Sequence, residues 1–325
     1  MKKIRYGILS TAQIARNKHL PAALSTTNSE IVAISSRDYE TARNWTDKLG
    51  IKKAYGSYEE LINDPEIDAV INPLPNSLHL EWTLRALDAK KHVLCEKPIT
   101  MNAQEADELI NASKKSGFLV MEAFTHRFKD EVVFIRDLIS SGRMGKVYAV
   151  YSSLVFYTEK LDQNIRSKKS LGGGVLLDGA CYCVSLSRFI LSDEVKSVQG
   201  CQSIKAPYDV DTTFTGTMQF KGGTLASFIS SMEVPYDSRL LVLCEKGKIV
   251  LEDFFDGNKV FYKIGDTEYV KEFPVKDRFA LQMEHFSDCI LSNKKPIFSL
   301  EDARNNMLVL DALKKSAENG SRVIL

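Results

Sequence analysis

Short apolar runs alternate with amphipathic stretches along the first third of the chain. The apolar runs at residues 4–9, 30–35, 54–55, 67–71, 92–95 and 118–121 predict strands. The stretches that begin at residue 14 and that cover 38–49, 57–63, 78–89 and 102–116 predict helices, the first of them kinked or restarted at Pro21. Regular alternation of strand and helix indicates a parallel sheet covered on both faces, the doubly wound α/β class.

The pattern changes after residue 123. A helix is expected at 131–140 and strands at 146–156, 195–204, 211–220, 224–232, 239–244, 247–252 and 259–264. Gly- and Lys-rich turns at 221–224 and 245–248 predict hairpins, and helices at 279–292 and 300–319 close the chain. We therefore predict a doubly wound domain at residues 1–123 and an α+β domain with an open, mostly antiparallel sheet at residues 124–325.

Composition narrows the class of protein. The chain has 325 residues, is 44% hydrophobic and carries a net charge of +1, which argues against nucleic acid as a partner. The amino-terminal residues lack the apolar core of a signal peptide, and we expect no membrane span. Six Cys and five His show no zinc spacing, so we expect no metal site. A cytoplasmic protein with reduced thiols is the resulting expectation.

In doubly wound sheets, ligands bind beyond the carboxyl ends of the strands. The side chains at those positions are Ser10, Thr11, Ala12, Gln13, Ser36, Arg37, Pro73, Leu74, Asn76, Glu96 and Lys97. The first turn, residues 10–15, reads Ser-Thr-Ala-Gln-Ile-Ala where a dinucleotide-binding turn usually reads Gly-x-Gly-x-x-Gly. Small residues still let the backbone approach a pyrophosphate at a helix N-terminus, so Ser10 to Ile14 are candidate cofactor contacts.

The end of the second strand bears on the choice of cofactor. NAD-binding strands usually end in an acid that holds the ribose 2′-hydroxyl, whereas this strand is followed by Ser36 and Arg37. A hydroxyl and a guanidinium suit a 2′-phosphate better, which favours NADP, although NAD remains possible. Asp38 can be read as an ordinary helix N-cap.

A Gly-rich stretch in the second half carries the candidate proton chemistry. Three glycines at 172–174 precede an apolar run with Asp178 and Tyr182, which are one helical turn apart and would share a face. A core tyrosine bonded to a nearby acid is one reading; a positioned proton donor or acceptor is the other. A neighbouring ammonium would stabilise the phenolate, and a cleft between the domains could bring Lys97 to Tyr182.

The motifs match a known family in their order along the chain. They lie at residues 7–15, 73–79, 95–98, 122–128, 164–166, 172–182, 210–213 and 299–303, with Glu96-Lys97-Pro98 and Asp178-x-x-x-Tyr182 as the specific elements. The chain resembles the Gfo/Idh/MocA oxidoreductases, in the branch with dihydrodiol dehydrogenase, D-xylose dehydrogenase and glucose–fructose oxidoreductase. Two departures stand out: Gly179 follows Asp178 where Ile or Val is usual, and Ser10 replaces a glycine.

The resemblance implies a Rossmann domain, an open-faced sheet domain that often dimerises, and a bound NADP or NAD without a metal. It implies that Tyr182 is the acid/base, that Lys97 assists it and that Asp178 lies alongside. It also implies that Pro73, Leu74, Asn76 and His79 line the nicotinamide. A homodimer or homotetramer is the expected assembly.

Three further residues are candidate substrate contacts. Arg127 could meet a substrate oxygen or pair with an acid, and Phe156 and Phe279 could floor the pocket or pack in the core. The leading expectation is an NADP-preferring dehydrogenase or reductase acting on a sugar, polyol or cyclic diol. The alternatives are a cofactor-binding sensor without turnover and an enzyme that retains its cofactor through a closed redox cycle.

Overall fold

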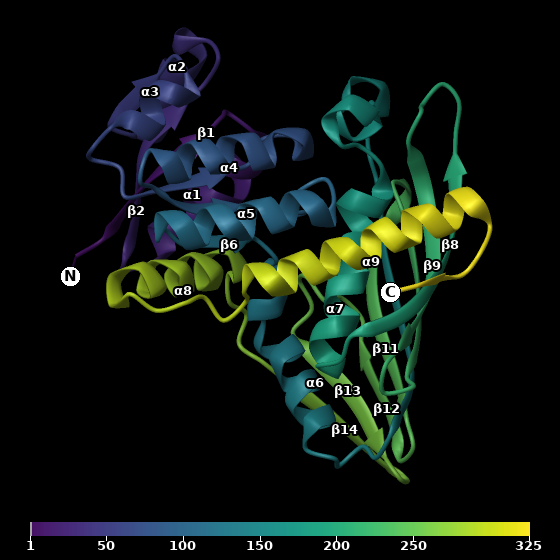
Figure 1. The fold of residues 1–325 in the computed structure, drawn as a ribbon. Helices are drawn as coiled ribbons and strands as arrows, with labels where there is room; N and C mark the ends of the chain where they lie inside the picture. The colour runs from purple at the N-terminus through teal and green to yellow at the C-terminus, as the bar shows by residue number, and fades with distance from the viewer. Residues whose placement is uncertain (1) are drawn as a thin grey trace. The chain divides into compact units, whose positions relative to one another are not determined.

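The computed structural model describes residues 2–325 and contains two compact units (Figure 1). The first comprises residues up to 125 together with 276–305, and the second comprises 126–275 with 306–325. The single boundary predicted near residue 123 therefore misses a return of the chain. Helix α8 (Arg278–Ser292) packs against α1 (Leu20–Ser25) and β1 (Ile4–Leu9) of the first unit, where its face with Phe279, Met283 and Phe286 is buried.

The first unit holds a parallel sheet in the order β3-β2-β1-β4-β5-β6. Its strands are β1 (Ile4–Leu9), β2 (Ser29–Ser35), β3 (Lys53–Tyr55), β4 (Ala69–Asn72), β5 (His92–Cys95) and β6 (Val120–Glu122). The central strands are buried along almost their whole length, as expected for a sheet covered on both faces. The predicted doubly wound sheet is confirmed.

Three of the five helices that alternate with these strands begin at a side-chain cap. The five helices are α1 (Leu20–Ser25), α2 (Tyr39–Leu49), α3 (Tyr58–Asn63), α4 (His79–Asp88) and α5 (Ala103–Ser116). Asp38, Ser57 and Asn102 cap α2, α3 and α5 through their side chains. The helix after β1 passes through a π-helical turn (Ala15–His19) before α1, and Pro21 lies in the first turn of α1, where its missing N–H costs nothing.

The second unit holds a mostly antiparallel sheet in the order β14-β13-β12-β11-β7-β10-β9-β8-β15, in which β10 and β7 pair in parallel. The strands are β7 (Val147–Tyr157), β8 (Val195–Ile204), β9 (Asp211–Phe220), β10 (Leu225–Ser231), β11 (Glu233–Cys244), β12 (Gly247–Leu251), β13 (Lys259–Ile264), β14 (Thr267–Glu272) and β15 (Val323–Ile324). The sequence did not predict β14 and β15. Strand β14 is exposed along its whole length and β15 has two residues, so neither shows the alternation of apolar and polar positions that predicts a strand.

One face of this sheet is open. Helices α6 (Asp130–Ser140) and α7 (Cys181–Leu191) belong to this unit, and α9 (Leu300–Asn319) contributes its later residues to it. On the open face, Tyr151, Leu225 and Leu243 are 39%, 56% and 44% exposed, and a hollow of about 540 Å³ is lined by β7, β8, β9 and β10. One helical stretch, Lys169–Leu191, is long and apolar enough to cross a membrane, but 72% of its apolar window is buried, as in a core helix.

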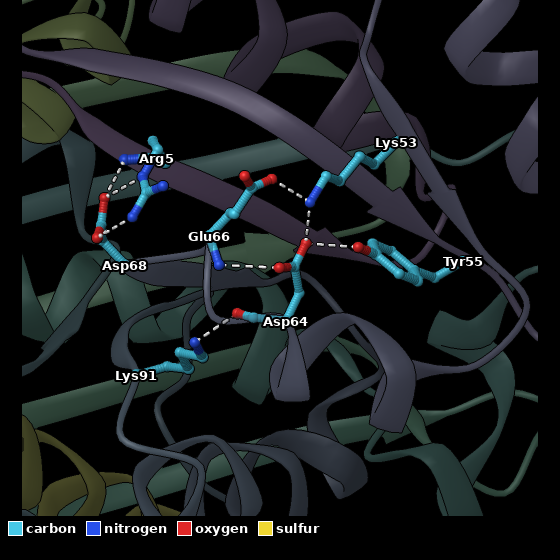
Figure 2. A network of polar contacts seen from close by, with 7 residues as sticks. All are labelled: Arg5, Lys53, Tyr55, Asp64, Glu66, Asp68 and Lys91. Atoms are coloured by element: carbon cyan, nitrogen blue, oxygen red, sulfur yellow. Dashed lines mark hydrogen bonds and ion pairs between the residues drawn. The ribbon is translucent and has the colours of Figure 1, made fainter.

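Charged groups hold the amino ends of the parallel strands (Figure 2). Arg5 pairs with Asp68 through two guanidinium nitrogens at 2.9 Å, and Lys53 and Tyr55 both bond to Asp64. Although burial opposes it, the hydrogen bonds from Lys53 and Tyr55 lower the pKa of Asp64 to about 2. These contacts occupy the edge of the sheet that lies away from the strand carboxyl ends.

Lys91 is the most buried cation of this network. Its ammonium donates to the carbonyl oxygens of Asp64 and Ile67, each at 2.7 Å, and burial lowers the pKa of Lys91. Lys91→Met keeps the length of the side chain but leaves both carbonyls without their donor. We expect the free energy of unfolding to fall by roughly 2–4 kcal/mol in urea denaturation. Lys90→Met at the exposed neighbouring position is the control, and an equal loss there would contradict this role for Lys91.

Candidate active site

The turn after β1 has the backbone of an anion-binding loop. Ser10 adopts a φ of 110°, a conformation that favours glycine, and its hydroxyl accepts the Ala12 N–H at 3.3 Å. The helix begins at Gln13, and Ser10 to Ile14 are all partly or fully exposed. Small residues and a helix start directly after a strand fit the pyrophosphate of a dinucleotide, so Ser10 meets the geometric need that glycine usually meets.

The end of β2 presents Ser36 and Arg37. Asp38 follows, but its carboxylate accepts the Thr41 N–H at 2.9 Å and the Thr41 hydroxyl at 2.5 Å. These hydrogen bonds lower the pKa of Asp38 and commit it to the N-cap of α2, as the alternative reading predicted. The exposed Arg37 is left as the charged group at the end of this strand.

The loop after β4 is held from within. Asn72 donates to the carbonyl of His79, and His79 is 0% exposed. The His79 ring has Nδ1 2.7 Å from the Pro98 carbonyl and Nε2 2.8 Å from the Leu74 carbonyl. His79 therefore joins the loop after β4 to the segment after β5. It fixes the loop that carries Pro73, Leu74 and Asn76, and both ring nitrogens are taken up by backbone.

At the end of β5, Glu96 is buried and Lys97 is half-buried. A Glu96 oxygen lies 2.8 Å from His19 Nε2, and His19 lowers the pKa of Glu96 although burial opposes this. Phe279 lies in the same unit, with its ring edge-on to His19 at 5.4 Å between centroids and 6% of its surface exposed. The structure thus places Phe279 with His19 and Glu96, the residue next to Lys97.

In the second unit, the Gly-rich stretch brings two segments into contact. Gly174, at a φ of 107°, donates its N–H to the Arg166 carbonyl at 2.9 Å. A Cβ on Gly173 would collide with that carbonyl, and one on Gly174 would collide with the Asp211 carboxylate. The segment around Arg166 can therefore lie directly on the start of the helix that follows.

That helix begins as a π-helical turn (Leu176–Ala180) and continues as α7. Gly179 lets this turn lie against β10, because a Cβ there would collide with the Ser230 hydroxyl. Asp178 precedes the half-buried Tyr182 by one turn. The Arg166 Nε donates to Asp178 at 2.5 Å; the charge of Asp178 raises the pKa of Arg166 against the effect of burial, and Tyr182 adds to that rise.

Aromatic groups enclose the Tyr182 ring. Phe255 meets it edge-on at 4.8 Å and His126 at 5.3 Å between centroids. Lys129 donates to the carbonyls of Phe255 and Gly257 at 2.9 and 2.8 Å, which fixes the loop that carries Phe255. The Tyr182 ring therefore packs against two side chains that other contacts hold in place, since His126 also lies 3.3 Å from the Ser185 hydroxyl.

The two remaining substrate candidates of the second unit lie in different settings. Phe156 is half-buried beneath the Arg166 guanidinium, 5.8 Å from it, and so belongs to the group around Asp178. Arg127 is 3% exposed; its Nε donates to Ser185 at 2.8 Å and its guanidinium lies over Phe189. Arg127 thus contacts the turn of α7 that follows Tyr182.

Asp211 caps the start of the helix that carries Asp178. Its Oδ2 accepts the Leu176 N–H at 2.6 Å, and burial raises the pKa of Asp211 to about 6. Sequence reasoning gave no role to Asp211, Arg166, His126, Lys129 or Phe255. Arg166, His126 and Asp211 lay in motifs already noted, whereas folding brings Phe255 to Tyr182 and Lys129 to the carbonyl of Phe255.

No group of three His, Cys, Asp or Glu that could hold a metal ion occurs among residues 2–325. The second unit offers the Asp178 carboxylate, paired with the Arg166 guanidinium, and the Tyr182 phenol one helical turn further along the same helix. The first offers an anion-binding turn and a lysine at the carboxyl edge of its sheet. Acid–base chemistry coupled to a bound dinucleotide is within reach of these groups.

Both parts of the chain match models of known protein families. A model described as an oxidoreductase family with an NAD-binding Rossmann fold matches residues 4–124, and a Gfo/Idh/MocA C-terminal domain matches residues 132–250. D-xylose 1-dehydrogenase (NADP(+)) 2 of Haloferax volcanii is 32% identical over 98% of this chain and 99% of its own.

Two solved structures extend the comparison. Aldose–aldose oxidoreductase of Caulobacter crescentus, complexed with glycerol, has a TM-score of 0.93 and 26% identity, covering 100% of both chains. The 3-ketoreductase KijD10 of Actinomadura kijaniata, in complex with NADP and TDP-benzene, has a TM-score of 0.91 and 27% identity, covering 97% of this chain and 98% of its own. The predicted resemblance and an NAD(P) cofactor are confirmed. The chain belongs to the Gfo/Idh/MocA family of oxidoreductases.

Proposed function

We propose that the protein is an NADP-preferring cytoplasmic dehydrogenase or reductase that acts on a CH–OH group of a sugar, polyol or cyclic diol. The observation that carries the proposal is the contact of Asp178 and Arg166 at the start of the helix that presents Tyr182. The relatives' names supply the substrate class, since they include a xylose dehydrogenase and a sugar ketoreductase.

The proposed roles follow from the side chains. The bound nicotinamide supplies the hydride acceptor or donor. During oxidation, the substrate C–H bond breaks as hydride leaves, the hydroxyl proton passes to the Tyr182 phenolate oxygen, and the carbon–oxygen double bond forms. In reduction, Tyr182 returns the proton to the carbonyl oxygen. We assign Lys97 to stabilising the phenolate and Asp178 to orienting the donor groups beside it. Arg127, Phe156 and Phe279 remain proposed substrate-side residues.

The test of this function is a panel of aldoses, polyols, inositols, cyclic diols and dicarbonyls, followed by the absorbance of the reduced nicotinamide. We expect turnover on at least one member. Tyr182→Phe should lower kcat by roughly 10²–10⁴-fold, because it removes the proton carrier, while the cofactor still binds. Tyr148→Phe removes an exposed phenol elsewhere in the same unit, so it is the matched control and should lose far less activity.

Other outcomes of the panel separate the alternatives. Turnover retained in Tyr182→Phe would remove the proton role of this residue and leave the enzyme class. Bound cofactor without turnover on any member would favour a sensor. An aldose pair that is converted without a net absorbance change, with cofactor that copurifies, would favour the closed cycle, which the likeness to aldose–aldose oxidoreductase makes the second candidate.

Arg37 is the residue on which the NADP preference rests. Because Asp38 is occupied as a helix cap, the ribose side of the site has a guanidinium without a competing carboxylate. Arg37→Ala should raise the KM for NADP roughly tenfold, the effect of losing one charged hydrogen bond, and leave the KM for NAD nearly unchanged. Arg43→Ala on the outer surface of α2 is the control. Equal KM values for NAD and NADP in the wild type would refute the preference.

We also propose a homodimer that pairs through the open sheet face. Support comes from its exposed Tyr151, Leu225 and Leu243 and from the hollow beside them. Leu225→Glu should halve the mass measured by light scattering from twice to once the 36.5 kDa of one chain. Ile297→Glu, at an exposed apolar residue of the first unit, should leave the mass unchanged. A monomeric wild type would overturn the proposal.

A further inference from the structure

Arg166 is fixed more firmly than a half-exposed arginine usually is. Its backbone N–H donates to the side-chain oxygen of Asn164 at 3.1 Å, and its backbone carbonyl accepts the Gly174 N–H at 2.9 Å. The guanidinium lies 5.8 Å from the Phe156 ring and donates to Asp178 at 2.5 Å. Backbone and side chain are thus both held in one place, which lowers the entropy lost in keeping the ion pair together.

The charge of this pair bears on Tyr182. Asp178 alone, one helical turn before the phenol, would disfavour the phenolate by like-charge repulsion. The Arg166 guanidinium is bonded to Asp178 at 2.5 Å, and its positive charge offsets that repulsion.

We propose that Arg166 is a positioning residue of the reaction, whose guanidinium neutralises Asp178 and thereby favours the ionised form of Tyr182. The inference rests on the proposed proton role of Tyr182. It assigns a second cation to the acid/base system, from the same unit as the tyrosine. It also gives a role to the close contact between the Asn164–Arg166 segment and the glycines at 173–174, which places the Arg166 side chain beside Asp178.

Four groups of this unit bear on the phenol or on its ring. Asp178 precedes Tyr182 on the same helix, Arg166 comes from the preceding loop and pairs with Asp178, and His126 meets the ring edge-on with its Nε2 3.3 Å from the Ser185 hydroxyl. Phe255 also meets the ring edge-on and carries no charge. A change in the ionisation of Tyr182 on altering Arg166 can therefore be separated from His126 by repeating the titration in His126→Gln.

The experiment compares Arg166→Gln, Asp178→Asn and the double variant in the oxidation direction. Loss of the guanidinium leaves Asp178 facing the phenol, so the pKa that governs kcat/KM should rise by about one unit. Activity should then fall roughly tenfold at neutral pH and recover at alkaline pH. Asp178→Asn should move the same pKa downward, and the double variant should return it close to the wild-type value.

If the salt bridge were merely structural, Arg166→Gln would lower kcat/KM by the same factor at every pH. The double variant would then not recover the wild-type activity. Arg136→Gln is the matched control, because Arg136 also pairs with an aspartate, Asp137, and lies over the Phe189 ring. It should leave the pH profile in place. An unshifted profile in Arg166→Gln would overturn the proposal.

A second readout does not need turnover. The near-ultraviolet tyrosinate absorbance is titrated with and without Tyr182→Phe, so that the difference isolates this phenol from the other tyrosines. We expect the Tyr182 titration to move upward in Arg166→Gln even if no substrate on the panel reacts. A failure of the proposed function and a failure of this inference are therefore distinguishable, and an unchanged titration refutes the inference alone.

Discussion

Close backbone approach at Gly173 and Gly174 is the constraint on which the candidate site of the second unit depends. The Gly174 N–H meets the Arg166 carbonyl, and the Asp211 carboxylate occupies the space in which a Cβ would stand. Any larger side chain would separate the loop from the helix start. The pairing of Arg166 with Asp178, and with it the charge beside Tyr182, follows from this contact.

The same helix start is supported by contacts from other elements. Its first turn is π-helical, a form often found at functional sites, and the Asp211 carboxylate accepts the N–H of the buried Leu176. Gly179 lets it lie against β10, while Lys129 fixes the Phe255 loop on the other side of the phenol. The tyrosine is thus positioned by buried polar contacts on several elements and not by its own helix alone.

In the first unit, different groups lie at the two ends of the parallel strands. At the amino ends, Lys53, Asp64 and Lys91 form a network that satisfies buried charge and backbone carbonyls. At the carboxyl ends lie the turn at Ser10, the loop held by His79 and the side chain of Lys97, which are the proposed ligand-binding groups. This separation allows charged residues to stabilise the sheet without competing for the cofactor.

The sequence by itself determined the alternation of strand and helix, the helix cap at Asp38, the cofactor class and the family, because these depend on local pattern and on motifs contiguous in the chain. Only the tertiary structure decided that α8 returns to the first unit, that β14 joins the sheet, and that Arg166, His126 and Phe255 surround Asp178 and Tyr182. The tertiary structure also decided the contacts of His79 with two backbone carbonyls and of Arg127 with Ser185. Such contacts join residues far apart in the chain, and no local period encodes them.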